Sequence, residues 1–179
     1  MRLLNRERFL NTIGFTDKGS YKYRYRNPNN ITVYWDALPS GLDDKCFLLL
    51  MMLASLADGN NVLSRRVSRK SKFSTIIYKP MDKEDIRDSL KWKFGENKFD
   101  KCWTELKKHC IKQIKYYDDR LFWVINPAFV NRCRSVPYWL YKEFSVYMNP
   151  YMTKLAINKM HDIITENERI INEYNKEEN

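Results

Sequence analysis

The chain has 179 residues, and 44% of them are hydrophobic, which is enough to bury the core of one ordinary domain. Its 32 basic and 22 acidic residues give a net charge of +10, so polyanions, above all nucleic acids, are the natural partners. The longest apolar run, 46–57, is shorter than the ~20 residues that span a bilayer, and no signal peptide precedes it. We therefore expect a soluble cytoplasmic protein with no membrane partner.

The residues that usually carry catalysis or bind metals are sparse and scattered. His109 and Cys110 are neighbours, but on a helix they would point about 100° apart and could not share a proton. No glycine-rich phosphate loop can be found among five glycines. We predict reduced thiols, no metal site, no cofactor and no enzymatic activity. Four cysteines are widely spaced, without a C-x-x-C pair: Cys46, Cys102, Cys110 and Cys133.

Residues 1–30 are predicted to form an N-terminal helix followed by a basic Tyr/Arg arm. The helix is expected over 3–13, where apolar residues recur at helical spacing. In 20–28, tyrosines alternate with lysine and arginine, which indicates a strand with one tyrosine face and one cationic face. We favour an edge strand with buried tyrosines. A surface that stacks single-stranded DNA or RNA bases is the alternative.

Residues 31–132 are predicted to form the body of the fold. A strand over 31–35 precedes a core helix that begins at Asp43 and Asp44, where negative charge suits a helix N-terminus. An exposed basic loop follows it and leads into a strand that ends before Pro80, and Asp82 is a candidate cap for the next helix. The later elements are expected to be a short helix over 83–92, a third helix over 97–111 and a hairpin of 114–117 with 121–125.

Residues 133–179 are predicted to form a C-terminal helical extension. Pro137 begins one helix, and Asn149 with Pro150 interrupts it. The final helix, expected over 151–174, carries an apolar stripe that continues past a mostly charged end. Such a stripe favours packing against a partner helix, so we expect a homodimer through this segment.

The order core helix, short helix, amphipathic helix and hairpin is that of a winged helix, in which the helix before the hairpin enters the major groove. We therefore predict an α+β fold with a winged helix-turn-helix core that binds double-stranded DNA. The third helix presents one polar face, formed by Asn97, Lys101, Thr104 and Lys108. Asparagine can pair with adenine, and lysine can reach guanine or phosphate. A solvated helix surface has the same composition and stays open as the alternative.

Further cations in the hairpin and the basic loop are expected to contact phosphates, which give affinity without sequence preference. For the basic loop, a solvated surface is an equally good interpretation. The candidate DNA-binding residues are therefore Asn97, Lys98, Lys101, Thr104, Lys108, Lys112, Lys115, Arg120, Arg65, Arg66, Arg69 and Lys70.

From 31 to 132 the chain resembles the RepL group, the winged-helix replication proteins of Gram-positive plasmids, and similar phage proteins. The resemblance lies in 31–53, in CWTELKKHCIKQI at 102–114 and in LFWVINPAF at 121–129. It implies a role in starting replication at a plasmid or phage origin, or in transcription regulation, inside a bacterial host cell. The basic stretch 64–79 and the Tyr/Arg arm depart from the pattern.

A second function class is a phage-encoded structural or protein-interaction module built on the same winged-helix body, which would also allow a place in the virion. Its support is the aromatic load, five Trp and twelve Tyr, together with the C-terminal helix. For such a protein, alteration of Asn97 and Lys101 would change nothing.

Overall fold

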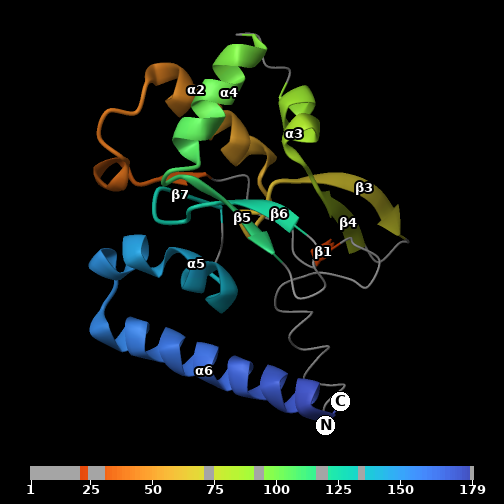
Figure 1. Cartoon of the computed structure of the whole chain (residues 1–179), viewed down its shortest axis with the longest axis vertical. Coiled ribbons are helices and arrows are strands. Elements are labelled where there is room, and N and C mark those ends of the chain that lie inside the picture. Colours follow the sequence, from red (N-terminus) through yellow and green to blue (C-terminus); the bar gives the residue numbers. More distant parts are fainter. Residues whose placement is uncertain are drawn as a thin grey trace.

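The computed structural model describes residues 21–23, 31–70, 75–90, 95–115, 121–132 and 136–177. It is a mixed α+β fold in which helices pack on short antiparallel strand pairs (Figure 1). The predicted helix over 3–13 and Arg120 lie outside the described residues. Of the strand residues Tyr21–Tyr23, only the backbone is described.

A two-stranded hairpin forms the middle layer of the molecule, with helices on both of its sides (Figure 1). The hairpin strands are β5 (Ile111–Lys115) and β6 (Leu121–Ile125). On one side lie α2 (Asp44–Leu56), α3 (Lys83–Ser89) and α4 (Glu96–Leu106). On the other side lies α5 (Tyr138–Met148), followed by α6 (Lys154–Glu177).

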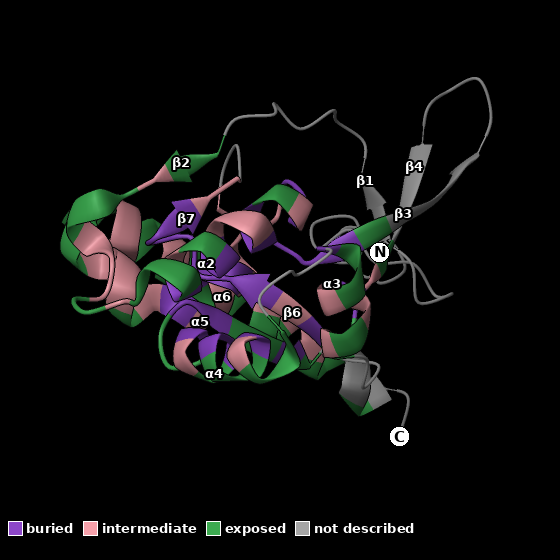
Figure 2. Ribbon diagram, turned by 90° about the horizontal axis from the view of Figure 1, so that it is seen from above, coloured by how far each residue is buried: buried purple, intermediate pink, exposed green. Residues whose placement is uncertain are grey.

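The hairpin is buried on both faces because alternate residues of β6 join different parts of the core. Phe122 and Val124 pack with Leu140 and Phe144 of α5. Ile125 belongs to the larger cluster with α2 and α4. This alternation follows from the period of two in a strand, and it explains why β6 is buried along most of its length (Figure 2).

The predicted helix start at Asp43 and Asp44 and the predicted cap at Asp82 are both confirmed. The Asp43 side chain accepts a hydrogen bond from the Lys45 amide at 2.7 Å, and Asp82 accepts one from the Asp85 amide at 2.7 Å. Each cap satisfies an amide that has no partner within its helix. In α2, Leu49, Leu50 and Leu53 are fully buried, as expected of the core helix, whereas Leu48 is exposed.

The segment after α2 is held by a buried asparagine. Asn61 has a φ of 59° and no exposed surface. Its Nδ2 donates to the carbonyls of Ile125 (3.1 Å) and Val130 (2.7 Å), and its Oδ1 accepts from the Arg132 amide (2.8 Å). The backbone then pairs with β6, since the Ile125 amide donates to the Asn61 carbonyl at 2.9 Å. Asn61 thus joins the segment after α2 to the end of β6 and to the residues of and after β7.

The predicted third helix is wrong at its C-terminal end, because α4 ends at Leu106 and β5 begins at Ile111. The reason lies far along the chain at Asn126. Its Nδ2 donates to the His109 carbonyl at 3.0 Å, and its amide donates to the Cys110 carbonyl at 2.8 Å. Because these carbonyls already accept hydrogen bonds from Asn126, they do not serve as acceptors for a further helical turn. The hairpin itself is confirmed, with β5 beginning three residues earlier than predicted and with 116 and 117 outside the described residues.

The prediction of an exposed basic loop that carries Arg65, Arg66, Arg69 and Lys70 is wrong. These residues lie in a strand, β3 (Ser64–Lys70), which pairs with β4 (Thr75–Pro80). The ladder of backbone hydrogen bonds decides this conformation, and a register shift between Arg66 and Ser68 interrupts the alternation that would reveal a strand in the sequence.

The remaining strands are short. The expected strand over 31–35 is found as β2 (Thr32–Val33), paired with β7 (Val130–Asn131), and it gives way to a 3₁₀ turn, η1 (Trp35–Ala37). The predicted strand in the Tyr/Arg arm is confirmed over β1 (Tyr21–Tyr23), which pairs with β4.

The C-terminal helices are confirmed. α5 follows Pro137, a 3₁₀ turn, η2 (Asn149–Tyr151), interrupts the chain, and α6 ends it. Leu140 and Tyr141 of α5 are fully buried, so this helix is part of the core around the hairpin. α6 packs on α5, with the ring centroids of Tyr141 and His161 6.2 Å apart. Among the described helices, none has the length and apolar character needed to cross a bilayer.

Substitution Asn61→Gly is expected to lower the free energy of unfolding by about 3 kcal/mol or more, because it leaves buried backbone groups without their side-chain partners. Glycine accepts the positive φ, so backbone strain does not contribute. Urea unfolding followed by circular dichroism measures the change. Asn60→Gly in the same turn is the matched control and should change stability by less than about 1 kcal/mol. Equal losses in both variants would contradict the role of Asn61.

Burial raises the pKa of Asp58 to about 7, although its carboxylate accepts hydrogen bonds from the amides of Asn60 and Val62. The unfolded chain therefore releases this proton at lower pH than the folded chain does. Folding stability is lost as pH rises from about 4 through 7, by up to about 4 kcal/mol. Asp58→Asn should remove this loss, so its advantage over the native chain should grow from pH 4 to 8. Parallel pH profiles in urea unfolding would contradict the assignment.

Candidate nucleic-acid interface

Helix α4 is anchored by one wholly buried side. Phe99, Cys102, Trp103 and Leu106 are each at most 2% exposed. The rings of Phe99 and Trp103 stack with centroids 5.5 Å apart, and Trp103 meets Trp123 of β6 edge-on at 4.9 Å. Because these large side chains pack against α2 and the hairpin, the helix has a single orientation, and its opposite side faces solvent.

The outward side of α4 carries the predicted polar residues together. Asn97, Lys101 and Thr104 are exposed, and Lys108 is exposed in the turn that follows the helix. We call these four residues the α4 face. Their separations of four, three and four residues place them in one row along the helix. The row points away from the core and is accessible to a large ligand.

Ion pairs take up part of the positive charge around this face. Lys98 Nζ lies 2.8 Å from Asp43 Oδ2, and Lys108 Nζ lies 2.5 Å from Glu105 Oε2. The bond from Lys98 holds the pKa of Asp43 below its usual value, and Asp43 raises the pKa of Lys98. Lys101 has no such ion pair within the described part of the chain. Its ammonium is therefore the cation of the α4 face most available to an anionic ligand.

The hairpin cations lie on different faces. Lys112 is opposite Val124, on the side that α5 covers, and its Nζ lies 2.5 Å from Glu143 Oε2. Lys115 is opposite Leu121, on the same face as Trp123 and therefore on the side of α4. Both are exposed.

The predicted basic residues of 65–70 are not part of the α4 face. Arg65 is half-exposed, and its Nη1 lies 3.3 Å from Asp85 Oδ1 of α3. For Arg66, Arg69 and Lys70 only the backbone in β3 is described.

Sequence reasoning missed Lys107 and Lys79. Lys107 is exposed directly after α4 and lies three residues beyond Thr104, a spacing that could have suggested it. Lys79 is exposed on β4 opposite Arg65, and only the strand pairing reveals this position.

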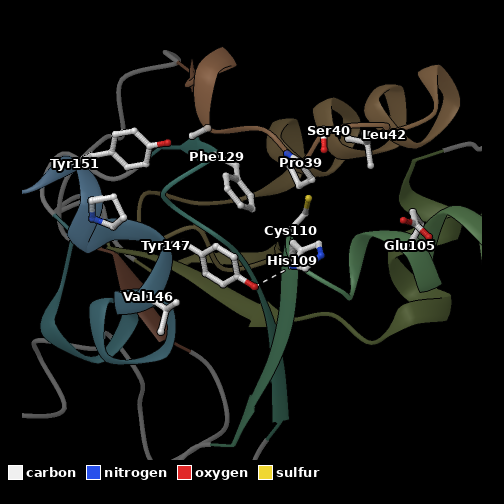
Figure 3. Close-up of a pocket in the computed structure, with 12 residues that line it drawn as sticks. Pro39, Ser40, Leu42, Glu105, His109, Cys110, Phe129, Val146, Tyr147 and Tyr151 are labelled. Carbon is white, nitrogen blue, oxygen red and sulfur yellow. Dashed lines mark hydrogen bonds between the residues drawn. The ribbon is translucent and has the colours of Figure 1, made fainter.

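A separate open cavity of about 440 Å³ lies between the turn after α4, the segment before α2, and α5 (Figure 3). His109 Nδ1 and the Tyr147 hydroxyl are 3.0 Å apart on its wall, and the Tyr147 ring meets Phe129 edge-on at 5.4 Å. None of the predicted DNA-binding residues lines this cavity. Its wall is mostly aromatic and apolar.

The Cys110 thiol is buried, and desolvation raises its pKa to about 12. The buried thiols of Cys46 and Cys102 face each other with their Sγ atoms 2.8 Å apart, and both are free. Across the described residues, no group of three His, Cys, Asp or Glu side chains is placed to hold a metal ion.

No family model matches the chain, and no curated protein or solved structure is significantly similar to it.

Alkylation should reveal the environment of Cys110. At pH 8 its thiolate fraction in the folded chain should be about a thousandfold below that of an ordinary thiol, because burial raises its pKa from 9.0 to about 12. Iodoacetamide labelling of the folded and guanidinium-unfolded chain, read by peptide mass spectrometry, measures the difference. Labelling of folded Cys110 as fast as in the unfolded chain would show that the thiol is not buried.

Proposed function

We propose that this protein is a winged-helix protein that binds double-stranded DNA, with α4 in the major groove. The order α2, α3, α4 and hairpin β5–β6 supports the proposal. So does the pairing of the segment after α2 with β6, which includes a hydrogen bond from the Leu63 amide to the Trp123 carbonyl at 2.9 Å. In a winged helix the strand between the first two helices adds to the hairpin, and the hydrogen bond between Leu63 and Trp123 supports the proposal on that ground.

The single observation that carries the proposal is the α4 face. A helix of about 10–12 Å diameter fits a major groove about 12 Å wide. Asn97 offers both an amide donor and a carbonyl acceptor, the pair that recognises adenine, and Lys101 reaches guanine or phosphate. The buried side of α4, fixed by Phe99 and Trp103, holds these groups in place before DNA arrives.

Cations beside the α4 face supply the affinity that does not depend on sequence. Lys107 lies on this side of the molecule, and the net charge of +10 attracts DNA over longer distances. Three other candidate lysines already have carboxylate partners, and each can bind a phosphate only by exchanging that partner for it. The pairs are Lys98 with Asp43, Lys108 with Glu105 and Lys112 with Glu143.

On the resemblance to the RepL group, we propose that this binding occurs at a plasmid or phage origin or at an operator, in the cytoplasm of a bacterial host. We infer a homodimer through α6, in which Leu155 is 80% and Ile163 36% exposed. A dimer would bind two half-sites about one helical turn of DNA apart.

The test is fluorescence anisotropy with mixed-sequence duplex DNA between roughly 50 and 200 mM salt. Native chain that neutralises several phosphates should lose about a thousandfold in affinity across this range. Asn97→Ala/Lys101→Ala should bind at least tenfold more weakly at each salt concentration, lose sequence preference and show a smaller dependence on salt.

Lys154→Ala/Asn172→Ala is the matched control, because it removes the same two residue types from exposed positions of α6 that lie on another side of the helix from Leu155 and Ile163. It should bind like the native chain. Weak native binding, or an α4 variant that binds as the native chain does, would overturn the groove-reading helix and favour the structural or protein-interaction module.

A further inference from the structure

The cavity beside α5 has the size of a small-molecule site. Its volume of about 440 Å³ lies within the range of roughly 300–1,000 Å³ that such sites occupy. Its wall comes from segments far apart in the chain: the stretch from η1 to α2, the end of α4 with the turn after it, Phe129, and α5 with η2. Every lining residue belongs to the described part of the chain, and no residue of the α4 face is among them.

Aromatic rings form the middle of the cavity wall (Figure 3). The Tyr147 hydroxyl lies 3.0 Å from His109 Nδ1, and the two rings meet edge-on with their centroids 6.0 Å apart. The Tyr147 ring also meets the Phe129 ring edge-on at 5.4 Å. Because Tyr147 is held by both neighbours, a ligand meets a wall that is formed before it arrives.

The mouth of the cavity exposes apolar surface. Val146 is 79% and Tyr151 65% exposed, although both are large and largely apolar side chains, and both line the cavity. A ligand that covers part of this surface removes it from water, which is favourable. The lining therefore favours a ligand with an apolar, ring-shaped body.

The charge of the wall is opposite to that of the whole chain. Among the lining residues, all of them described, Glu105 supplies a carboxylate, and lysine and arginine are absent. The ion pair with Lys108 uses Oε2 of Glu105, so Oε1 can accept a hydrogen bond from a second donor. Burial, and after it the Glu105 carboxylate, raises the pKa of the Cys110 thiol, so the negative charge acts on the wall itself.

We propose that this cavity binds an organic cation that combines an aromatic body with a primary ammonium group. Figure 3 shows Glu105 at one end of the cavity and Tyr151 at the other, with Tyr147 between them. The aromatic body packs against the two tyrosine rings, and the ammonium group donates a hydrogen bond to Glu105. Such charge-assisted bonds are about twice as strong as neutral ones. This site goes beyond DNA binding by α4 and does not depend on it.

The first experiment is isothermal titration calorimetry of the full chain with tryptamine, tryptophol and indole-3-acetate. These probes share an indole body and carry charges of about +1, 0 and −1 at pH 7. Tryptamine should bind at least about tenfold more tightly than tryptophol, and indole-3-acetate should bind most weakly. Non-specific attraction to a chain of charge +10 has the opposite order. Equal affinities, or a preference for indole-3-acetate, would overturn the proposal.

A matched pair of variants tests the carboxylate. Glu105→Gln keeps the shape of the side chain and removes its charge, so it should weaken tryptamine binding at least about tenfold and change tryptophol binding less than about twofold. Glu143→Gln is the control, because Glu143 is also paired with a lysine at 2.5 Å but does not line the cavity. It should bind tryptamine as the native chain does. Equal losses in the two variants, or normal binding by Glu105→Gln, would overturn the role of Glu105.

A second pair tests the aromatic wall. Tyr151→Ala should weaken tryptamine and tryptophol alike, by about fivefold, because both probes lose the same ring contact. Tyr34→Ala is the control, since Tyr34 is 45% exposed but does not line the cavity. It should bind both probes as the native chain does. Normal binding by Tyr151→Ala would show that the probes bind elsewhere and would overturn the site. Unchanged far-ultraviolet circular dichroism shows that each variant is folded.

Discussion

The buried amide of Asn61 is the contact on which the arrangement of the molecule depends. It bonds to Ile125, Val130 and Arg132, so the end of α2 is fixed to the strand that closes the hairpin and to the segment that follows it. Both the donor and the acceptor of the amide are used at a site with no exposed surface, where an unmade hydrogen bond is costly. With this junction in place, the segment at Val62 and Leu63 pairs with β6, and the hairpin lies between α4 and α5.

A hairpin buried on both faces restricts where charged groups can lie. Its apolar side chains fill the interior, so the cations of β5 stand at positions that remain open, Lys112 towards α5 and Lys115 towards α4. The same constraint on α4 leaves one polar row, Asn97 to Thr104, on the outside. Burial therefore determines the geometry of the proposed DNA surface, and the ion pair of Lys98 with Asp43 determines which of its cations are available.

Those parts of the fold that depend on neighbours in sequence were predictable. The caps at Asp43 and Asp82 act within three residues, and the buried side of α4 follows from helical spacing. The end of α4 was not predictable, since Asn126 captures carbonyls that a local pattern assigns to the helix. Some candidate DNA-binding cations are paired with carboxylates far away in the chain, as Lys112 is with Glu143. Such an ion pair leaves no periodic pattern in the sequence, so it could not be predicted.

By itself, the sequence determined the positive charge, the order of helices and hairpin, and which side of α4 is polar, because these properties follow from composition and from interactions within a few residues. Only the tertiary structure decided that residues 64–70 form a strand paired with β4 and not a loop. That outcome depends on a ladder between strands from three parts of the chain and on a shift of one residue in its register. A single shift moves every later side chain to the other face, and no local pattern in β3 records it.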